Sequence, residues 1–137
     1  MNITLKTEYA LLAIEELIEH NSSKPVSRKQ ISKNKMISEH FLEKIFINLK
    51  KNKIIRSVKG PGGGFVLDKP INEITLWDIY SAVDDTDNRI EGCYVKQAEA
   101  CPLKLKCKTK NIWFKFAKVL KESMSSISLN DLIKEEI

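Results

Sequence analysis

Residues 38–67, SEHFLEKIFINLKKNKIIRSVKGPGGGFVL, constrain the fold of this chain more than any other stretch. The first part predicts an amphipathic helix, because apolar residues recur every three or four positions after Ser38, a residue type that caps helix N-termini. The second part predicts a β-hairpin, since the short runs IIRSV and GFVL flank the glycine-rich turn KGPGGG. Few architectures place such a helix directly before a glycine-tipped hairpin.

A shorter helix is expected just before this segment. Ser27 and Gln30 have the spacing of a capping box, and about two helical turns follow them. Two helices joined by a short turn predict a helix-turn-helix, and a basic hairpin after them makes a winged helix. Without the hairpin, an ordinary helical hairpin would fit equally well. A nucleotide phosphate loop is a poor interpretation of KGPGGG, because a strand rather than a helix follows it.

Two further helices are expected around this unit. The segment TEYALLAIEELIEH has its apolar residues on one stripe, with Glu15, Glu16 and Glu19 expected on the opposite, solvent side. His20 is expected to be a helix-end residue rather than a metal ligand. The second helix, LWDIYSAVD, should be capped by Thr75 and should pack on the winged helix.

Basic residues are concentrated in the first half of the chain. Residues 24–59 hold 11 Lys and Arg against 2 Asp and Glu, a local charge of +9, whereas the whole chain has a net charge of +5. Such a local excess favours a surface that binds a polyanion. The chain shows no signal-peptide pattern and no apolar run of membrane length, so we expect a cytoplasmic protein without a membrane partner.

All three cysteines lie in one 15-residue segment, CYVKQAEACPLKLKC, as Cys93, Cys101 and Cys107. In a reducing cytoplasm such a cluster favours metal binding or redox chemistry over a disulfide framework. Iron–sulfur clusters and zinc normally take four protein ligands, and no fourth cysteine or nearby histidine is present. A thiol redox switch, which needs only two cysteines, stays open.

A long helix, NIWFKFAKVLKESMSSI, is predicted after the cysteines. Its broad aromatic stripe fits either docking on a second subunit or packing within its own core. The expected fold is mainly α with a small β-hairpin, divided into a winged helix-turn-helix domain at 1–84, a cysteine loop at 85–110 and a helix with a C-terminal tail at 111–137. The stripe residues assigned to dimerisation are Ile112, Trp113, Phe116, Val119 and Leu120.

Several segments together resemble a family of bacterial winged-helix transcriptional regulators that includes IscR, NsrR and RirA. They are TEYALLA, ISEHFLEKIFINLKKNKIIRSVKGPGGGFVL, ITLWDIYSAV and the cysteine cluster, and they cover essentially the whole chain in order. The resemblance implies a homodimer, not an enzyme, that binds a palindromic operator in double-stranded DNA and pairs through its long C-terminal helix. It also implies a [2Fe–2S] or [4Fe–4S] cluster on the cysteines that controls DNA binding in response to nitric oxide, redox state or iron and cluster supply.

The cysteine loop departs from the family pattern in two ways. Seven residues separate Cys93 from Cys101, where five are usual, while Cys101 and Cys107 keep the usual five. IscR-like members place a histidine three residues after the last cysteine, but Lys110 stands there. NsrR-like members use an acidic residue of the other subunit, and Glu8 matches it, directly before a tyrosine. Glu8 is therefore the candidate fourth ligand, although an acidic residue also suits a helix N-terminus.

The recognition helix and the wing supply the candidate DNA contacts. Outward residues of the helix are expected to contact bases, and Glu43 could accept a hydrogen bond from a cytosine amino group. Arg28 and Lys50 are expected to contact phosphates, and the wing to enter or grip the minor groove. The full set is Arg28, Ser38, Glu39, His40, Glu43, Lys44, Lys50, Arg56, Lys59, Gly60, Pro61, Gly62, Gly63 and Gly64.

Other functions fit the sequence less well. A regulator that uses its cysteines as a thiol switch, without a cluster, is the main alternative. An enzyme or electron carrier is disfavoured, because there is no Ser–His–Asp set or nucleotide fingerprint and the basic segment would have no role. A dimeric module that binds a partner protein through its basic face would be separated from a DNA-binding protein by salt-sensitive binding to duplex DNA.

Overall fold

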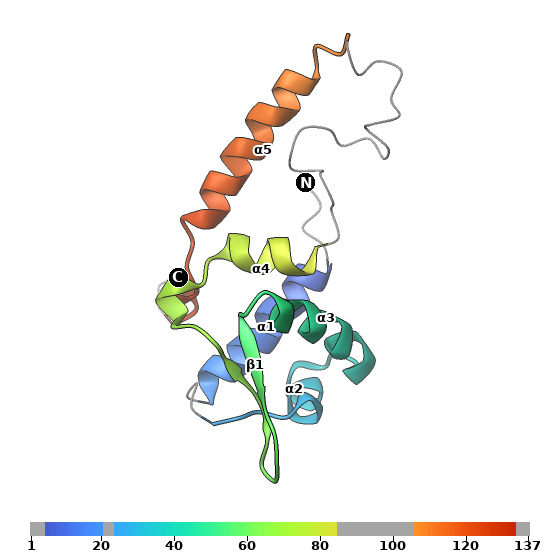
Figure 1. The fold of residues 1–137 in the computed structure, drawn as a ribbon, viewed down its shortest axis with the longest axis vertical. Helices are drawn as coiled ribbons and strands as arrows, with labels where there is room; N and C mark the ends of the chain where they lie inside the picture. The colour runs from blue at the N-terminus through green and yellow to red at the C-terminus, as the bar shows by residue number, and fades with distance from the viewer. Residues whose placement is uncertain (1–4, 21–23, 85–105, 134–137) are drawn as a thin grey trace.

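A computed structural model describes residues 5–20, 24–84 and 106–133. As predicted, these residues are mainly helical and hold one two-stranded antiparallel sheet. Figure 1 shows most helices packed together, with the wing projecting at one end and α5 extending away at the other. In chain order the elements are α1 (Leu5–Glu19), α2 (Arg28–Lys35), α3 (Glu39–Lys51), β1 (Ile55–Val58), β2 (Gly64–Leu67), η1 (Ile71–Glu73), α4 (Leu76–Val83), α5 (Lys110–Ser125) and η3 (Leu129–Leu132).

The helix-turn-helix forms where its caps predict it. The Ser27 side chain accepts a hydrogen bond from the backbone N–H of Gln30 at 3.1 Å, and α2 begins at Arg28, directly after Ser27. Ser38 caps α3 in the same way, accepting from the N–H of Phe41 at 3.2 Å. Between the helices Met36 has a φ of 56°, a left-handed conformation that ends α2. The two serines therefore fix both helix starts.

The wing is a hairpin with a third chain segment beside it. β1 and β2 pair in antiparallel register, with Ile55 opposite Leu67. Val26, just before α2, exchanges two backbone hydrogen bonds with Phe65 of β2, at 3.0 and 2.9 Å. This bridge attaches the wing to the start of the helix-turn-helix.

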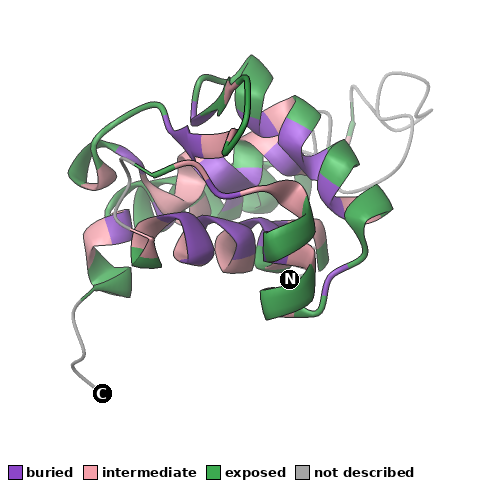
Figure 2. Ribbon diagram, turned by 90° about the horizontal axis from the view of Figure 1, so that it is seen from below, coloured by how far each residue is buried: buried purple, intermediate pink, exposed green. Residues whose placement is uncertain are grey.

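One core joins the three N-terminal helices, the wing and α4. Aromatic rings link these elements: between ring centroids, Phe46 of α3 lies 4.6 Å from Phe65 of β2, and Tyr9 of α1 lies 5.1 Å from Phe41 of α3. Figure 2 shows buried residues on the facing sides of the helices and exposed residues outside them. The core residues are Ala10, Ala13, Ile14, Leu17, Val26, Ile31, Ile37, Leu42, Ile45, Phe46, Leu49, Ile54, Ile55, Leu67, Ile74, Ile79, Val83 and Leu129.

The chain returns to this core after α5. Thr75 caps α4 with a complete capping box, as its sequence predicts. The same stretch then pairs with the residues that follow α5: the N–H of Leu76 donates to the carbonyl of Ile127 at 2.8 Å, and the N–H of Leu129 donates to that of Ile74 at 2.9 Å. Leu129 is buried in the core. The end of α5 is thus anchored in the winged helix.

Candidate nucleic-acid interface and cysteine loop

The outer face of α3 carries the residues expected to contact bases. Leu42, Ile45, Phe46 and Leu49 are buried and turn the opposite face of the helix into the core. The other face of the helix is exposed to solvent, and Figure 1 shows α3 in the same part of the molecule as the wing. The exposed residues of this set are Ser38, Glu39, His40, Glu43 and Lys44.

Two expected DNA contacts are joined to acidic partners. Arg28 Nη1 lies 3.9 Å from the Glu43 carboxylate, and Arg56 Nε lies 3.7 Å from that of Asp68. Both arginines are well exposed, so these ion pairs contribute little to stability. Their arrangement means that a phosphate approaching Arg28 competes with Glu43. A phosphate bound to Arg28 would therefore release the Glu43 carboxylate from its ion pair.

The wing tip depends on glycine at specific positions. Gly60 and Gly62 have φ values of 101° and 74°, which glycine adopts readily. The N–H of Gly63 donates to the carbonyl of Gly60 at 2.9 Å, which closes the turn. At Gly64 an added Cβ would lie 2.4 Å from the carbonyl atoms of Val26. The tip itself, including Lys59, Pro61 and Gly62, is exposed and projects beyond the helices.

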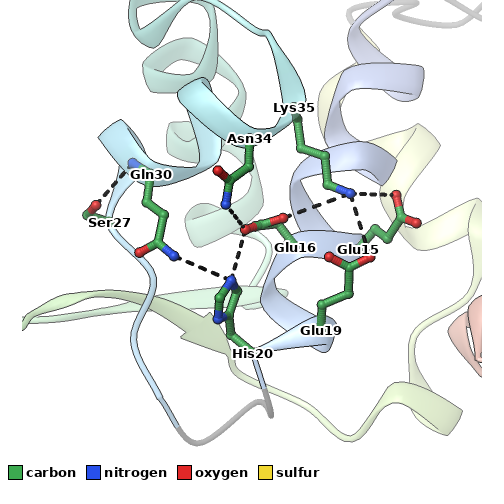
Figure 3. A network of polar contacts seen from close by, with 8 residues as sticks. All are labelled: Glu15, Glu16, Glu19, His20, Ser27, Gln30, Asn34 and Lys35. Atoms are coloured by element: carbon green, nitrogen blue, oxygen red, sulfur yellow. Dashed lines mark hydrogen bonds and ion pairs between the residues drawn. The ribbon is translucent and has the colours of Figure 1, made fainter.

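A polar network joins α1 to α2 (Figure 3). The Glu16 side chain is 2% exposed, which corrects its expected place on the solvent side. Its carboxylate accepts from the Asn34 amide at 2.5 Å and lies 2.9 Å from His20 Nε2. Lys35, which is 16% exposed, places Nζ 3.1, 3.8 and 3.7 Å from the carboxylates of Glu15, Glu16 and Glu19. A buried acid on α1 is thereby stabilised by two residues of α2.

The network sets the charge states of its central pair. Burial alone would raise the pKa of Glu16, but hydrogen bonds from Asn34 and His20, with the charges of His20 and Lys35, lower it below its ordinary value of 4.5. Burial likewise opposes the charge of Lys35, and its contacts with Glu15, Glu19 and Glu16 raise its pKa above 10.5. Both groups are therefore ionised at neutral pH.

One cysteine of the loop lies within the described residues. Cys107, three residues before α5, has its sulfur 3.0 Å from the Thr109 hydroxyl. This hydrogen bond and one from the backbone of Lys110 lower the pKa of the Cys107 thiol below 9.0. This shift raises the fraction of thiolate, the form that binds metal, above that of an unperturbed cysteine. Cys93 and Cys101 lie outside the described residues, and the described part of the chain holds no group of three potential metal ligands.

Glu8 and Cys107 belong to distant parts of the chain. Glu8 is exposed in the first turn of α1, which packs in the body of the molecule. The start of α5, next to Cys107, lies at the far end of the projecting helix in Figure 1. Within one chain, the start of α5 therefore lies well away from α1 (Figure 1).

The helix α5 is exposed along most of its length. Its buried residues are Ala117 and Met124, and Leu120 between them is half-buried on that same side. The other residues expected at a dimer interface, Ile112, Trp113, Phe116 and Val119, are exposed. Phe114, which the sequence reasoning did not select, is exposed as well. Of the helices in the described ranges, none is long and apolar enough to cross a membrane.

The last turns of α5 are fixed to α4 by side chains as well as backbone. Lys121 Nζ lies 5.4 Å from the centroid of the Trp77 ring, a cation–π contact. Sequence patterns gave no signal for this contact, or for the pairing of Lys35 with Glu16, since each joins residues distant in the chain.

His20 was expected at a helix end and does lie directly after α1.

Proteins of known kind resemble this chain over nearly its whole length. Residues 3–135 match the Rrf2 family model, described as iron-dependent transcriptional regulator. The HTH-type transcriptional regulator IscR of Pectobacterium carotovorum is 32% identical over 136 residues, 99% of this chain and 81% of that protein. The structure of T. potens IscR matches with a TM-score of 0.76 and 28% identity, covering 98% of this chain and 88% of the other.

A second kind of relative shares the fold. The structure of CymR, named the global cysteine regulator of B. subtilis, matches with a TM-score of 0.73 and 28% identity, covering 96% of this chain and 95% of the other. These similarities confirm the winged-helix fold with its long C-terminal helix, and they connect the chain to regulators of transcription rather than to enzymes. The chain belongs to the Rrf2 family of iron-dependent transcriptional regulators, and it is a DNA-binding regulator of the IscR-like kind.

Proposed function

We propose that this regulator is a homodimer whose binding to a palindromic operator is controlled by an iron–sulfur cluster on Cys93, Cys101 and Cys107. The observation that carries the proposal is the position of Cys107 relative to α5. Cys107 directly precedes the exposed start of this helix, and the other end of the helix is anchored beside α4 in the winged-helix core. A change at the cysteines therefore acts on a helix fixed to the DNA-binding domain.

Dimerisation through α5 is supported by its exposed apolar residues. Ile112 and Val119 are each more than half exposed, and their spacing of seven residues places them on one face of the helix. An apolar surface of this kind on a small domain is typical of a protein–protein interface. Two copies of α5 packed side by side would bury these residues and present two winged helices to one operator.

The thiol chemistry fits an iron–sulfur cluster. The Cys107 side chain is partly exposed and the pKa of its thiol is lowered, and thiolates are the ligands that hold such clusters. When bound, the cluster would supply a tie between the three thiolates that breaks on oxidation, nitrosylation or loss of iron. The residues of this chain would then determine how the loss of that link affects α3 and the wing.

Glu8 of the partner subunit is our candidate for the fourth ligand. The distance between the start of α5 and α1 within one chain favours a contribution from the other subunit. A helix of 16 residues is about 24 Å long, so an antiparallel α5 pair would carry each cysteine loop toward the partner's body. Ligation between subunits would hold the winged helices at the spacing of two operator half-sites, which lie about one DNA turn apart.

The test is to purify the full chain without oxygen and to record its visible spectrum with its iron and acid-labile sulfide content. A cluster predicts visible absorption with matched iron and sulfide, and a Cys107→Ser variant should lose both. Ser123→Ala, an exposed change on the same helix, should keep them. DNA affinity is then measured on operator duplexes selected from a random library, with and without the cluster. Equal affinity in the two states would contradict the proposed control.

A thiol switch without a cluster is the second candidate. It is favoured by the accessible Cys107 thiol and by the structural similarity to CymR, which is named a cysteine regulator. Protein that is free of iron, binds DNA and changes its affinity reversibly with thiol oxidants would establish this alternative. In that case, replacing Glu8 would leave the response unchanged, whereas the cluster model predicts that Glu8→Gln weakens cluster retention.

A further inference from the structure

We propose that Ile47 reads thymine in the operator, by packing against the C5-methyl group of the base. The inference rests on the DNA-binding function given above. Among the residues of α3, Ile47 is the large aliphatic side chain that is exposed, at 61%. Leu42, Ile45 and Leu49 of the same helix are all buried. Since the core does not use Ile47, its apolar side chain is left for a surface contact.

The position of Ile47 on the helix places it on the same face as residues expected to contact bases. It follows Glu43 by four residues and Lys44 by three, so the three side chains are neighbours on one face. It follows His40 by seven residues, about two helical turns, and so lies nearly in line with it along the axis. The buried Leu49 lies on the opposite side of the helix.

The polar neighbours of Ile47 determine what kind of group it can contact. His40, Glu43, Lys44 and the half-buried Asn48 surround it, so this face offers no apolar patch for another protein. The floor of a DNA major groove has the matching arrangement, with hydrogen-bonding groups around one apolar feature, the methyl group of thymine. Ile47 therefore fits a small apolar group within a polar surface.

The helix geometry also states where the thymine should be. Ile47 follows His40 by seven positions, which is about 10 Å along the helix axis. Successive base pairs are about 3.4 Å apart. The thymine that Ile47 contacts should therefore lie about three base pairs from the base nearest to His40, once in each half-site.

The experiment pairs a protein variant with a DNA change that removes only the methyl group. Duplexes enriched from a random library by the full-length protein are resynthesised with each thymine replaced in turn by deoxyuridine, in both half-sites. Dissociation constants for the wild type and Ile47→Ala are measured by fluorescence anisotropy at one salt concentration. Ile133→Ala, an exposed isoleucine after η3, is the control, and Ile47→Val retains most of the apolar contact.

We expect one thymine position per half-site at which deoxyuridine weakens wild-type binding about fourfold per methyl group, the equivalent of about 0.8 kcal/mol. At that position Ile47→Ala should be insensitive to the exchange, while Ile47→Val and Ile133→Ala should respond like the wild type. Equal losses in the wild type and Ile47→Ala, or no sensitive thymine, would overturn the inference while leaving DNA binding intact. Failure to enrich any duplex would overturn the proposed function as well.

Discussion

The ammonium group of Lys35 lies 3.8 Å from the carboxylate of Glu16, a residue of a different helix whose side chain is almost fully enclosed. Lys35 also contacts Glu15 and Glu19, so one cation of α2 faces three acids of α1. This arrangement sets the position of α2, and with it the helix-turn-helix, against the helix that begins near Glu8. The charges thus hold α1 and α2 together.

Replacing Lys35 by Met should destabilise the protein by about 1–3 kcal/mol, because it leaves the buried Glu16 with an incomplete set of partners. Asn34 and His20 still contact Glu16, which keeps the loss below that of a fully orphaned charge. Lys33→Met, at an exposed position of the same helix, should change stability by less than about 0.5 kcal/mol. Urea unfolding of both variants measures the difference. Equal stability of the two variants would show that the contact is unimportant.

Glu16→Gln should change how stability depends on acidity. Because the folded-state pKa of Glu16 is lowered from 4.5, the unfolded chain takes up its proton first as the pH falls. The stabilisation from the carboxylate is therefore complete above about pH 4.5 and is lost below it, as the pH falls through the folded-state value. Free energies of unfolding measured between neutral pH and acid should fall more steeply for the wild type than for Glu16→Gln. Parallel curves would exclude this role.

Gly64→Ala should weaken the attachment of the wing. The added methyl would lie 2.4 Å from the backbone carbonyl of Val26, which cannot move without breaking its bridge to Phe65. We expect a loss of about 1–3 kcal/mol in stability. Gly62→Asn is the control, since its position is open and asparagine tolerates a positive φ better than most residues. Thermal unfolding that ranks the two variants the other way would contradict the close contact.

Lys59→Ala should weaken binding to all duplexes and reduce its dependence on salt. Lys59 is exposed at the wing tip. The slope of log K against log salt is negative, and each lost phosphate contact makes it shallower by about 0.9. Lys69→Ala removes an exposed lysine beyond the wing and should leave the slope unchanged. Titrations of one duplex at several salt concentrations provide the slopes. An unaltered slope for Lys59→Ala would exclude a phosphate contact at the wing.

Val119→Asp should convert a dimer to a monomer, because it places a charge among the exposed apolar residues of α5. Ile133→Asp introduces the same charge at an exposed aliphatic position outside α5 and should not alter assembly. Light scattering coupled to gel filtration gives the mass of each variant. A Val119→Asp protein that keeps the mass of the wild type would argue against α5 as the interface.

The sequence was informative where structure depends on near neighbours. The caps at Ser27, Ser38 and Thr75 all form as predicted, because a capping side chain acts only two or three residues away. The buried face of α3 also agrees with its periodicity. The capping box at Ser27 is only half made, since the Gln30 side chain lies 3.4 Å from His20 Nε2.

Contacts between distant segments could not be predicted in this way. Periodicity assigned Glu16 to the solvent side, because an acidic residue is normally exposed and its partners Asn34 and Lys35 belong to another helix. The pairing of Leu76 with Ile127 likewise joins residues that share no local pattern. The expected ligation by Cys93 and Cys101 falls outside the described residues and stays a prediction.

Because the chain returns to the core after α5, the winged helix is built from two separate segments of the chain. Leu129 completes a core built otherwise from residues before position 84, so this core contains residues from both sides of α5 in the chain. A fragment that stops at residue 84 would lack that core side chain and the backbone pairing at Ile74 and Leu76. Removal of the chain after residue 84 should therefore destabilise the winged helix itself, because part of its core would be missing.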